Sequence, residues 1–366
     1  MSVSLWKIQR ELRRLGSQLL EPYRQIRDAF LRLDYRLRHA HHVKHFDGHV
    51  GLTERVAVFL IHQPQGVSES VLATCEHLQQ QGYACVVVSN GHLTAEDLDR
   101  VLSRAAHVIV RPNFGYDFGG YQEGLVWLRQ KKVSLNYLLL LNDSVWFPVL
   151  RDSTFLKDME CTGADIVGAL SAQRGGAQRH QRKLFYASFM LLFSSKAWQS
   201  TKFQDFWKNY RQTSSKAATI RKGERKLSAL FIHDEYFTHQ VMVDSALYAK
   251  LALEITPSTW PSFGLELGLI DPVFDQQRRT LLEQTVPDTE SQWRDWYARL
   301  GESQNMFTCA QGSLVLRAGV PFIKKSRDPH NMLVLRQSID AFRACAAFNT
   351  TVAQEMQTQL DRHTYQ

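Results

Sequence analysis

The sequence lacks any apolar run long enough to cross a membrane, and it has few cysteines. A spanning helix needs about 20 consecutive apolar residues, and no segment of the 366-residue chain approaches that length. The five cysteines are odd in number, widely spaced and never in a CxxC pair, which argues against a disulfide framework and a thiolate zinc site. The N-terminus carries Glu and Arg where a signal peptide needs an apolar core. We therefore expect a cytoplasmic protein.

Excess positive charge is scarce outside the first 46 residues. Residues 1–46 hold ten Lys and Arg and four acidic residues, which accounts for six of the eight net positive charges of the chain. A nucleic-acid-binding protein would spread basic charge over its folded surface, so we expect no nucleic-acid partner. The hydrophobic content of 44% and charged content of 22% predict a folded chain rather than a disordered one.

The basic segment 1–46 has the pattern of an amphipathic helical arm. Apolar residues recur in steps of three and four from Leu5 to Leu37, with one slip between Leu19 and Tyr23, where Pro22 falls. Three interpretations remain: a helix packed on its own domain, a coiled-coil partner contact, and a helix on an anionic membrane surface, which would make the protein peripheral on the inner face of the membrane. The His-rich stretch HAHHVKHFDGHVG that follows is predicted to be a polar linker rather than a metal site.

The pattern changes from Glu54 onward. Four apolar, β-rich runs, RVAVFLIH, YACVVVSN, HVIVRP and YLLLL, are separated by helical patterns such as SESVLATCEHLQQQG and LTAEDLDRVLSRA, the second with Thr94 as a cap. Runs alternating with helices predict an α/β fold with a mostly parallel sheet flanked by helices. Further along, DTESQWRDWYARL predicts a helix, and residues 333–366 are expected to form a C-terminal helix.

Polar residues stand where each apolar run ends. In parallel sheets, ligands bind at the carboxyl ends of the strands, so these residues are candidates for substrate binding. They are His62, Ser89, Asn90 and Asn113 after the first three runs, and Asn142, Asp143 and Ser144 after the fourth.

The glycine-rich word NFGYDFGGY follows the third run. Gly115, Gly119 and Gly120 would let the backbone adopt positive φ or approach a ligand, and Asp117 is predicted to cap a helix that begins near Gly120. A capped turn without a ligand is the alternative. Neither GxxxxGK[ST] nor GxGxxG occurs, so Walker-type and dinucleotide-binding sites are not supported.

These words together resemble a known family. RVAVFLIHQP, GYACVVVSN, RPNFGYDFGGYQEGL and LLLLNDSVWFP are similar to the rhamnan-synthesis protein F family of bacterial surface polysaccharide assembly. GADIVGAL, FYASFMLLFSSKAW, HDEYFTHQV and AGVPFIKKSRDPHN continue the resemblance in order, over roughly residues 54–332. The resemblance implies a glycosyltransferase of the A-type nucleotide-diphospho-sugar fold, similar to a rhamnosyltransferase and of the inverting type.

The resemblance also implies ligands and roles. The donor would be a nucleotide-diphospho-sugar, and the acceptor a growing lipid-linked glycan such as O-antigen or capsule. Asp143 would hold a divalent metal, Mg²⁺ or Mn²⁺, although NDS has one acidic residue where such enzymes often carry DxD. The catalytic base would be Asp234 or Glu235, placed before a helical pattern.

Two basic stretches, AQRGGAQRHQRK and TIRKGERK, are predicted to be loops that are either solvated or bind a diphosphate. Two other functions remain open: a non-catalytic module that binds a glycan or organises a synthase complex, and a metal-dependent hydrolase that uses Asp143 with the HDE word.

Overall fold

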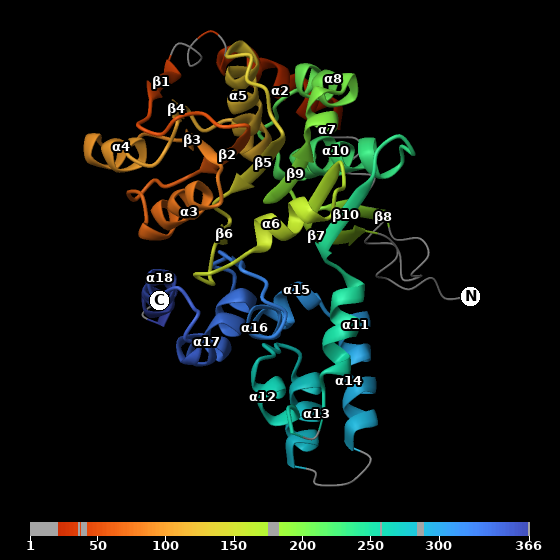
Figure 1. Ribbon diagram of the computed structural model, residues 1–366. Coiled ribbons are helices and arrows are strands. Elements are labelled where there is room, and N and C mark those ends of the chain that lie inside the picture. Colours follow the sequence, from red (N-terminus) through yellow and green to blue (C-terminus); the bar gives the residue numbers. More distant parts are fainter. Residues whose placement is uncertain are drawn as a thin grey trace.

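The computed structural model describes residues 21–35, 37, 42–174, 183–256, 258–283 and 289–364. Its strands and helices alternate through the first half of the chain, and helices dominate the second half (Figure 1). The strands are β1 (Lys44–Asp47), β2 (Arg55–Ile61), β3 (Ala84–Asn90), β4 (His107–Arg111), β5 (Tyr137–Asn142), β6 (Val145–Trp146), β7 (Ile166–Arg174), β8 (Lys183–Tyr186), β9 (Met190–Ser194), β10 (His239–Val243) and β11 (Ile323–Lys324).

The helices fall into those that cover the sheet and those that form the second half. The first group is α2 (Glu21–Asp34), α3 (Glu69–Gln80), α4 (Ala95–Leu102), α5 (Tyr116–Gln130), α6 (Phe155–Cys161), α7 (Ser195–Gln199), α8 (Thr201–Asn209), α9 (Lys216–Thr219), the π-helical turn η4 (Ile220–Glu224) and α10 (Arg225–Ile232). The second is α11 (Ser245–Leu253), α12 (Trp260–Leu265), α13 (Pro272–Glu283), α14 (Thr289–Ser303), α15 (Met306–Cys309), α16 (Gln311–Leu316), α17 (Pro329–Ala344) and α18 (Thr350–Thr364).

The main sheet has nine strands in the order β1-β4-β3-β2-β5-β9-β7-β10, with β8 paired to β7. Strands β4, β3, β2 and β5 are parallel neighbours, and β7 and β10 form a further parallel pair. β9 runs antiparallel between β5 and β7, which leaves β7 pointing the same way as β5. The predicted α/β fold with a mostly parallel sheet flanked by helices is confirmed.

The alternation of side chains along β2 explains the layers. Ala57, Phe59 and Ile61 belong to the buried cluster that includes α3, whereas Val56, Val58 and Leu60 belong to the cluster that includes α5, α8 and α10. Successive residues of a strand point to opposite faces, so an unbroken apolar run is what a strand covered on both faces requires.

Three expectations about local structure are wrong. The stretch predicted to be a linker contains β1, which extends the sheet by pairing antiparallel with β4. Residues 333–366 hold most of α17 and all of α18 rather than one helix, and α18 packs on α3. TIRKGERK is helical, running through α9, η4 and α10. In the other basic stretch, residues 175–182 lie outside the described residues, and its two ends belong to β7 and β8.

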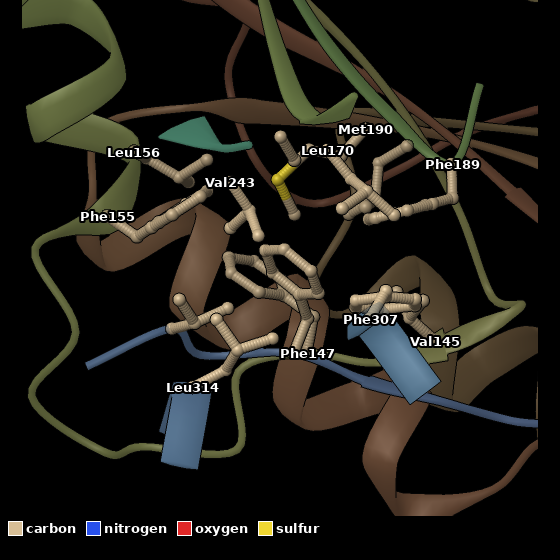
Figure 2. Packing of buried hydrophobic residues seen from close by; sticks show 14 of the residues in the cluster. Val145, Phe147, Phe155, Leu156, Leu170, Phe189, Met190, Val243, Phe307 and Leu314 are labelled. Atoms are coloured by element: carbon tan, nitrogen blue, oxygen red, sulfur yellow. The ribbon is translucent and has the colours of Figure 1, made fainter. Parts of the chain in front are cut away.

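The second half of the chain is joined to the sheet by a shared apolar core. Figure 2 shows Phe147, which follows β6, surrounded by residues from the sheet and by Phe307 and Leu314 from α15 and α16. Phe147 is 2% exposed and Leu314 is 1% exposed. This packing anchors the segment that leads from α16 to β11, which pairs with β6.

Candidate functional site

The predicted polar word NDS lies at the carboxyl edge of the sheet and is bonded to the end of β2. One carboxylate oxygen of Asp143, Oδ2, accepts hydrogen bonds from the backbone N–H of His62 at 2.8 Å and from Nε2 of Gln63 at 2.7 Å. Burial raises the pKa of Asp143, and the two hydrogen bonds and the charge of Lys325 act against that rise. The neighbouring strands β2 and β5 therefore bring His62 and Asp143 together, as the parallel pairing predicts.

A second carboxylate, Asp117, joins this edge from the first turn of α5. Its Oδ2 accepts a hydrogen bond from Nδ2 of Asn142 at 3.1 Å. Burial, followed by the negative charge of Asp143, raises the pKa of Asp117. Tyr121, one turn further along α5, donates its hydroxyl to the carbonyl of Ser188 at 2.9 Å. The two carboxylates thus form a like-charged, half-buried pair, which favours binding of a cation.

The glycines of NFGYDFGGY position this helix. Gly115 has φ of +84° and precedes α5, as predicted for a glycine in a positive-φ turn. Gly119 and Gly120 instead allow close packing: a Cβ would lie 2.4 Å from the Phe114 carbonyl oxygen at Gly119 and 2.1 Å from Leu60 Cδ1 at Gly120. The expected role of Asp117 as a cap is wrong, because α5 begins at Tyr116 and Asp117 lies inside it.

Lysines reach the same edge from the second half of the chain. Antiparallel pairing of β11 with β6 places Lys324 opposite Val145, and the N–H of Lys325 donates to the carbonyl of Ser144 at 2.8 Å. Burial, and next the charge of Lys216 in α9, lowers the pKa of Lys324, while Asp117 and Glu224 act in the opposite direction. Lys325 Nζ donates a hydrogen bond to Ser70 Oγ at 2.8 Å and forms an ion pair with Glu355 Oε1 at 3.2 Å.

Glu224 provides a third carboxylate at this edge. It ends the π-helical turn η4, a rare conformation that is frequent at functional sites. Its Oε1 accepts a hydrogen bond from the N–H of Ser188 at 3.2 Å, just before β9. Burial raises the pKa of Glu224 to about 7, and the charge of Asp117 adds to the rise. A carboxylate with this pKa can accept a proton near neutral pH.

The remaining predicted binding residues have mixed positions. Ser89 is buried and its hydroxyl donates a hydrogen bond to the carbonyl of Gly91 at 3.0 Å. The side-chain oxygen of Asn90 accepts a hydrogen bond from Arg111 at 2.5 Å. The backbone carbonyl of Asn90 is hydrogen-bonded to His62 Nδ1 at 2.6 Å. Asn113 is exposed, and Ser144 is half-buried beside Asp143. Ser89 and Asn90 therefore shape the edge by bonding to the protein.

A groove adjoins Asp143 on the side of β2. It has a volume of about 1030 Å³ and is lined by residues that include Gln63, Thr94, Arg100, Arg327 and Glu355. Gln63 belongs both to this groove and to the hydrogen-bonded surroundings of Asp143. Its lining includes three arginines and three acidic residues, and one of the arginines, Arg100, is paired with Asp97 and Glu69.

Asp234 and Glu235 are not brought to this site. They precede β10, whose first residue, His239, pairs with Ile166 at the start of β7. They therefore lie at the amino edge of the sheet, opposite Asp143. Glu235 is exposed, and Asp234 at the surface forms an ion pair with Lys202 that lowers its pKa. A strand, not the expected helix, follows them. The hydrolase that would combine Asp143 with the HDE word is excluded by this separation.

Sequence reasoning missed Glu224, Lys216 and Lys324. Glu224 lies in TIRKGERK, where only the basic residues were considered, and an isolated acidic residue in a basic stretch was the available signal. Lys324 lies in AGVPFIKKSRDPHN, which contributes to the resemblance but carries no predicted role. No motif links residue 324 to residue 145; only the pairing of β11 with β6 does.

The fit of a divalent cation depends on Asp117 and Asp143. Across the described ranges, no three His, Cys, Asp or Glu side chains are grouped so that they could hold a metal ion. Mg²⁺ commonly takes one or two carboxylates and completes its coordination with substrate phosphates and water. The like-charged pair of Asp117 and Asp143 meets that requirement.

Fold and site together define an α/β protein with a charged centre at the carboxyl edge of its sheet. Residues 85–263 match the family model described as rhamnan synthesis protein F. The resemblance to this family is confirmed over these residues, a shorter span than the expected 54–332.

Curated sequences and solved structures add further similarities. The chain is 32% identical over 188 residues to the uncharacterized protein y4gN of Sinorhizobium fredii, an alignment that covers 50% of this chain and 48% of that protein. The chain thus spans about half the length of the curated relative it matches.

The chain is also similar to three solved structures. The glycosyltransferase GlyE of Streptococcus pneumoniae has a TM-score of 0.29 and 11% identity, and the match covers 75% of this chain and 66% of that one. Core-mannan synthase A of Aspergillus fumigatus, in its Mn/GDP form, has a TM-score of 0.27 and 9% identity, and the match covers 44% of this chain and 65% of that one. A glycosyltransferase involved in glycosylation of the major capsid of PBCV-1 has a TM-score of 0.29 and 10% identity, and the match covers 67% of this chain and 99% of that one.

Proposed function

We propose that this chain is a glycosyltransferase that transfers a sugar from a nucleotide-diphospho-sugar to a bacterial surface glycan. The observation that carries the proposal is the convergence of Asp117, Asp143, Glu224 and Lys324 at the carboxyl edge of the sheet. The description of the matched family, rhamnan synthesis, supports a rhamnosyl donor and a growing polysaccharide acceptor such as O-antigen or capsule.

Glu224 replaces Asp234 and Glu235 as the proposed base. In an inverting transfer, Glu224 would accept the proton of the acceptor hydroxyl. The hydroxyl oxygen would then form a bond to the anomeric carbon of the donor, while the bond from that carbon to the diphosphate oxygen breaks. The carboxylate suits this step because burial keeps its pKa at about 7, close to the physiological range.

Lys324 and Lys216 would stabilise the departing nucleoside diphosphate. Both lysine charges lower the pKa of Asp117, and the charge of Lys324 also lowers the pKa of Glu224. In the proposed reaction the two lysines would therefore lie near the diphosphate, where negative charge develops. A divalent cation held by Asp117 and Asp143 would add positive charge against the diphosphate oxygens. The groove beside Gln63 would take the nucleotide part of the donor, with Arg327 as a cation in its lining.

The test combines donor binding with transfer. A panel of nucleotide-diphospho-sugars, each with and without Mg²⁺ or Mn²⁺, is screened by thermal shift, and the best donor is used in a transfer assay with lipid-linked glycan. We expect one donor to raise the melting temperature, more so with metal, and EDTA to remove that metal-dependent increment. If no donor changes the melting temperature and none supports transfer, the result would favour the non-catalytic glycan-binding or scaffold module.

Asp143→Asn sharpens this test. The change keeps the shape and removes the charge, so we expect the metal-dependent increment in donor binding to disappear and transfer to fall by about 100-fold or more. The matched control is Asp152→Asn, an exposed acidic residue nine positions along the chain, which should behave as the unmodified protein. Full activity of Asp143→Asn would exclude Asp143 from the site.

A further inference from the structure

Helix α2 shows its apolar side to solvent. Its residues Tyr23, Ile26, Phe30 and Leu33, with Leu37 just beyond, are 64%, 59%, 68%, 52% and 69% exposed. Their spacing of three and four residues places them on one side of the helix, and we call them the α2 stripe. A surface helix ordinarily buries such a stripe, and exposed apolar groups gathered in this way mark an interaction surface.

The opposite side of α2 is fixed to the protein by polar contacts. Asp28 is 4% exposed and accepts hydrogen bonds from the hydroxyls of Thr213 and Ser214. Arg32 donates to the carbonyl of Gln212 at 3.0 Å, and Arg27 donates to Ser214 Oγ at 3.1 Å. The helix is therefore held by its polar side, which leaves the α2 stripe outward.

The end of α2 is tied to the edge of the sheet that carries the site. The ring of Tyr35 stacks on Phe114 at 5.1 Å, and Arg111 at the end of β4 donates to the Tyr35 hydroxyl at 3.1 Å. In Figure 1, α2 lies at the outside of the sheet domain, in the same part of the view as α5 and α8. A surface that binds the α2 stripe would thus be held in a fixed relation to this edge.

Charge identifies the occupant of this surface. Residues 1–46 carry ten Lys and Arg against four acidic residues, and one of those four, Asp28, is buried against the protein. A second copy would bring the same positive excess and be repelled, whereas anionic lipid is attracted. The slip in the apolar repeat between Leu19 and Tyr23 also interrupts a coiled-coil seam, but it does not prevent a helix from lying in a membrane interface.

We propose that the α2 stripe inserts into the interface of an anionic membrane, with α2 lying flat and its polar side bonded to the catalytic domain. The aromatic rings of Tyr23 and Phe30 suit the boundary between headgroups and acyl chains. This inference does not depend on the proposed sugar transfer, because its test measures binding to lipid only.

The experiment is co-sedimentation of the full chain with vesicles of phosphatidylcholine containing phosphatidylglycerol, against vesicles of phosphatidylcholine alone. We expect binding to the anionic vesicles and its loss at about 1 M salt, where charges are screened within about 3 Å. The double variant Ile26→Ser/Phe30→Ser should bind at least about tenfold more weakly. Both side chains are exposed, so thermal unfolding should be unchanged.

The matched control is Leu253→Ser/Val273→Ser, which removes two apolar side chains that are 68% and 59% exposed in α11 and α13. It should bind vesicles as the unmodified chain does. Equal binding of the stripe variant and the unmodified chain, or no binding by the unmodified chain, overturns the proposal. So does a lipid-free dimer, detected by sedimentation velocity, that the stripe variant dissociates, since the occupant would then be a second copy.

Discussion

The two edges of the sheet hold carboxylates in opposite situations. At the amino edge, burial would raise the pKa of Asp165, but hydrogen bonds from Thr238, Lys196 and Ser194 outweigh it and lower that pKa. At the carboxyl edge, burial prevails, and the pKa values of Asp143 and Glu224 are raised. A buried carboxylate with a full set of donors stabilises the fold, whereas one with few donors costs stability and remains available for chemistry.

The geometry at Asp165 shows how complete the amino-edge bonding is. Its Oδ1 accepts from Ser194 at 2.9 Å, and its Oδ2 accepts from Lys196 and from the N–H of Thr238, each at 3.0 Å. Glu224, by contrast, accepts a hydrogen bond through Oε1 from one backbone N–H, that of Ser188. The contrast gives predictions about activity at one edge and about stability at the other.

The largest effect is expected from Glu224→Gln. Loss of the proposed base should lower the rate of transfer by about 10²–10⁴-fold while donor affinity persists, because the base acts in the transition state. The rate of the proposed transfer by the unmodified protein should rise with pH through about 7 as Glu224 ionises, and the variant should lack that rise. Glu235→Gln, at the exposed position first predicted for the base, is the control and should retain full activity.

The same substitution should stabilise the protein at alkaline pH. The pKa of Glu224 is raised from 4.5 to about 7 in the folded state, so the folded state binds more protons than the unfolded state between these values. Stability therefore falls as pH rises through that window. Glu224→Gln removes this cost of about 1–3 kcal/mol at pH 8 and should raise the melting temperature there. Equal melting temperatures at pH 8 would contradict the burial of an ionised Glu224.

Asp165→Asn should have a smaller effect, and one of opposite sign. Because its folded pKa is lowered, Asp165 stabilises the protein above the unfolded pKa of about 3.9, and this contribution is lost as pH falls through the folded pKa. We expect a loss on the order of 1–2 kcal/mol near pH 7, with turnover of the folded fraction unchanged. Chemical denaturation at pH 7 and below pH 4 measures the difference; a fall in turnover instead would give the amino edge a catalytic part.

The smallest effect is expected from Asp234→Asn. Asp234 lies at the surface and pairs with Lys202, and such ion pairs contribute little. Rates of the proposed transfer should stay within about twofold of those of the unmodified protein. A large loss of turnover with intact folding would restore Asp234 as the base and remove the contrast between the edges.

The sequence predicted the part of the site that depends on strand ends. Apolar runs such as YLLLL are recognisable locally, and parallel strands deliver their following residues to one edge, so His62 and Asp143 could be placed together. The fold class followed from the same alternation. These inferences need only short-range pattern and the known geometry of parallel sheets.

The rest depended on long-range pairing that no local pattern contains. β10 pairs parallel with β7, which points the same way as β5, so the segment after α10 lies at the amino edge and Asp234 is away from Asp143. Lys324 reaches the site through β11, and Glu224 through a π-helical turn within a stretch that was interpreted as a loop. The arm was ambiguous because α2 both packs on its own domain and exposes an apolar stripe.

The pairing of β11 with β6 has a consequence for the timing of activity during synthesis. The carboxylates at positions 117, 143 and 224 leave the ribosome long before residue 324, since the chain is made from its N-terminus. A nascent chain that has folded its sheet would hold these carboxylates with Lys216 but without Lys324, so the positive charge that would attract an anionic donor would be incomplete. The proposed site would be complete only after residue 324 has been made and β11 has paired with β6.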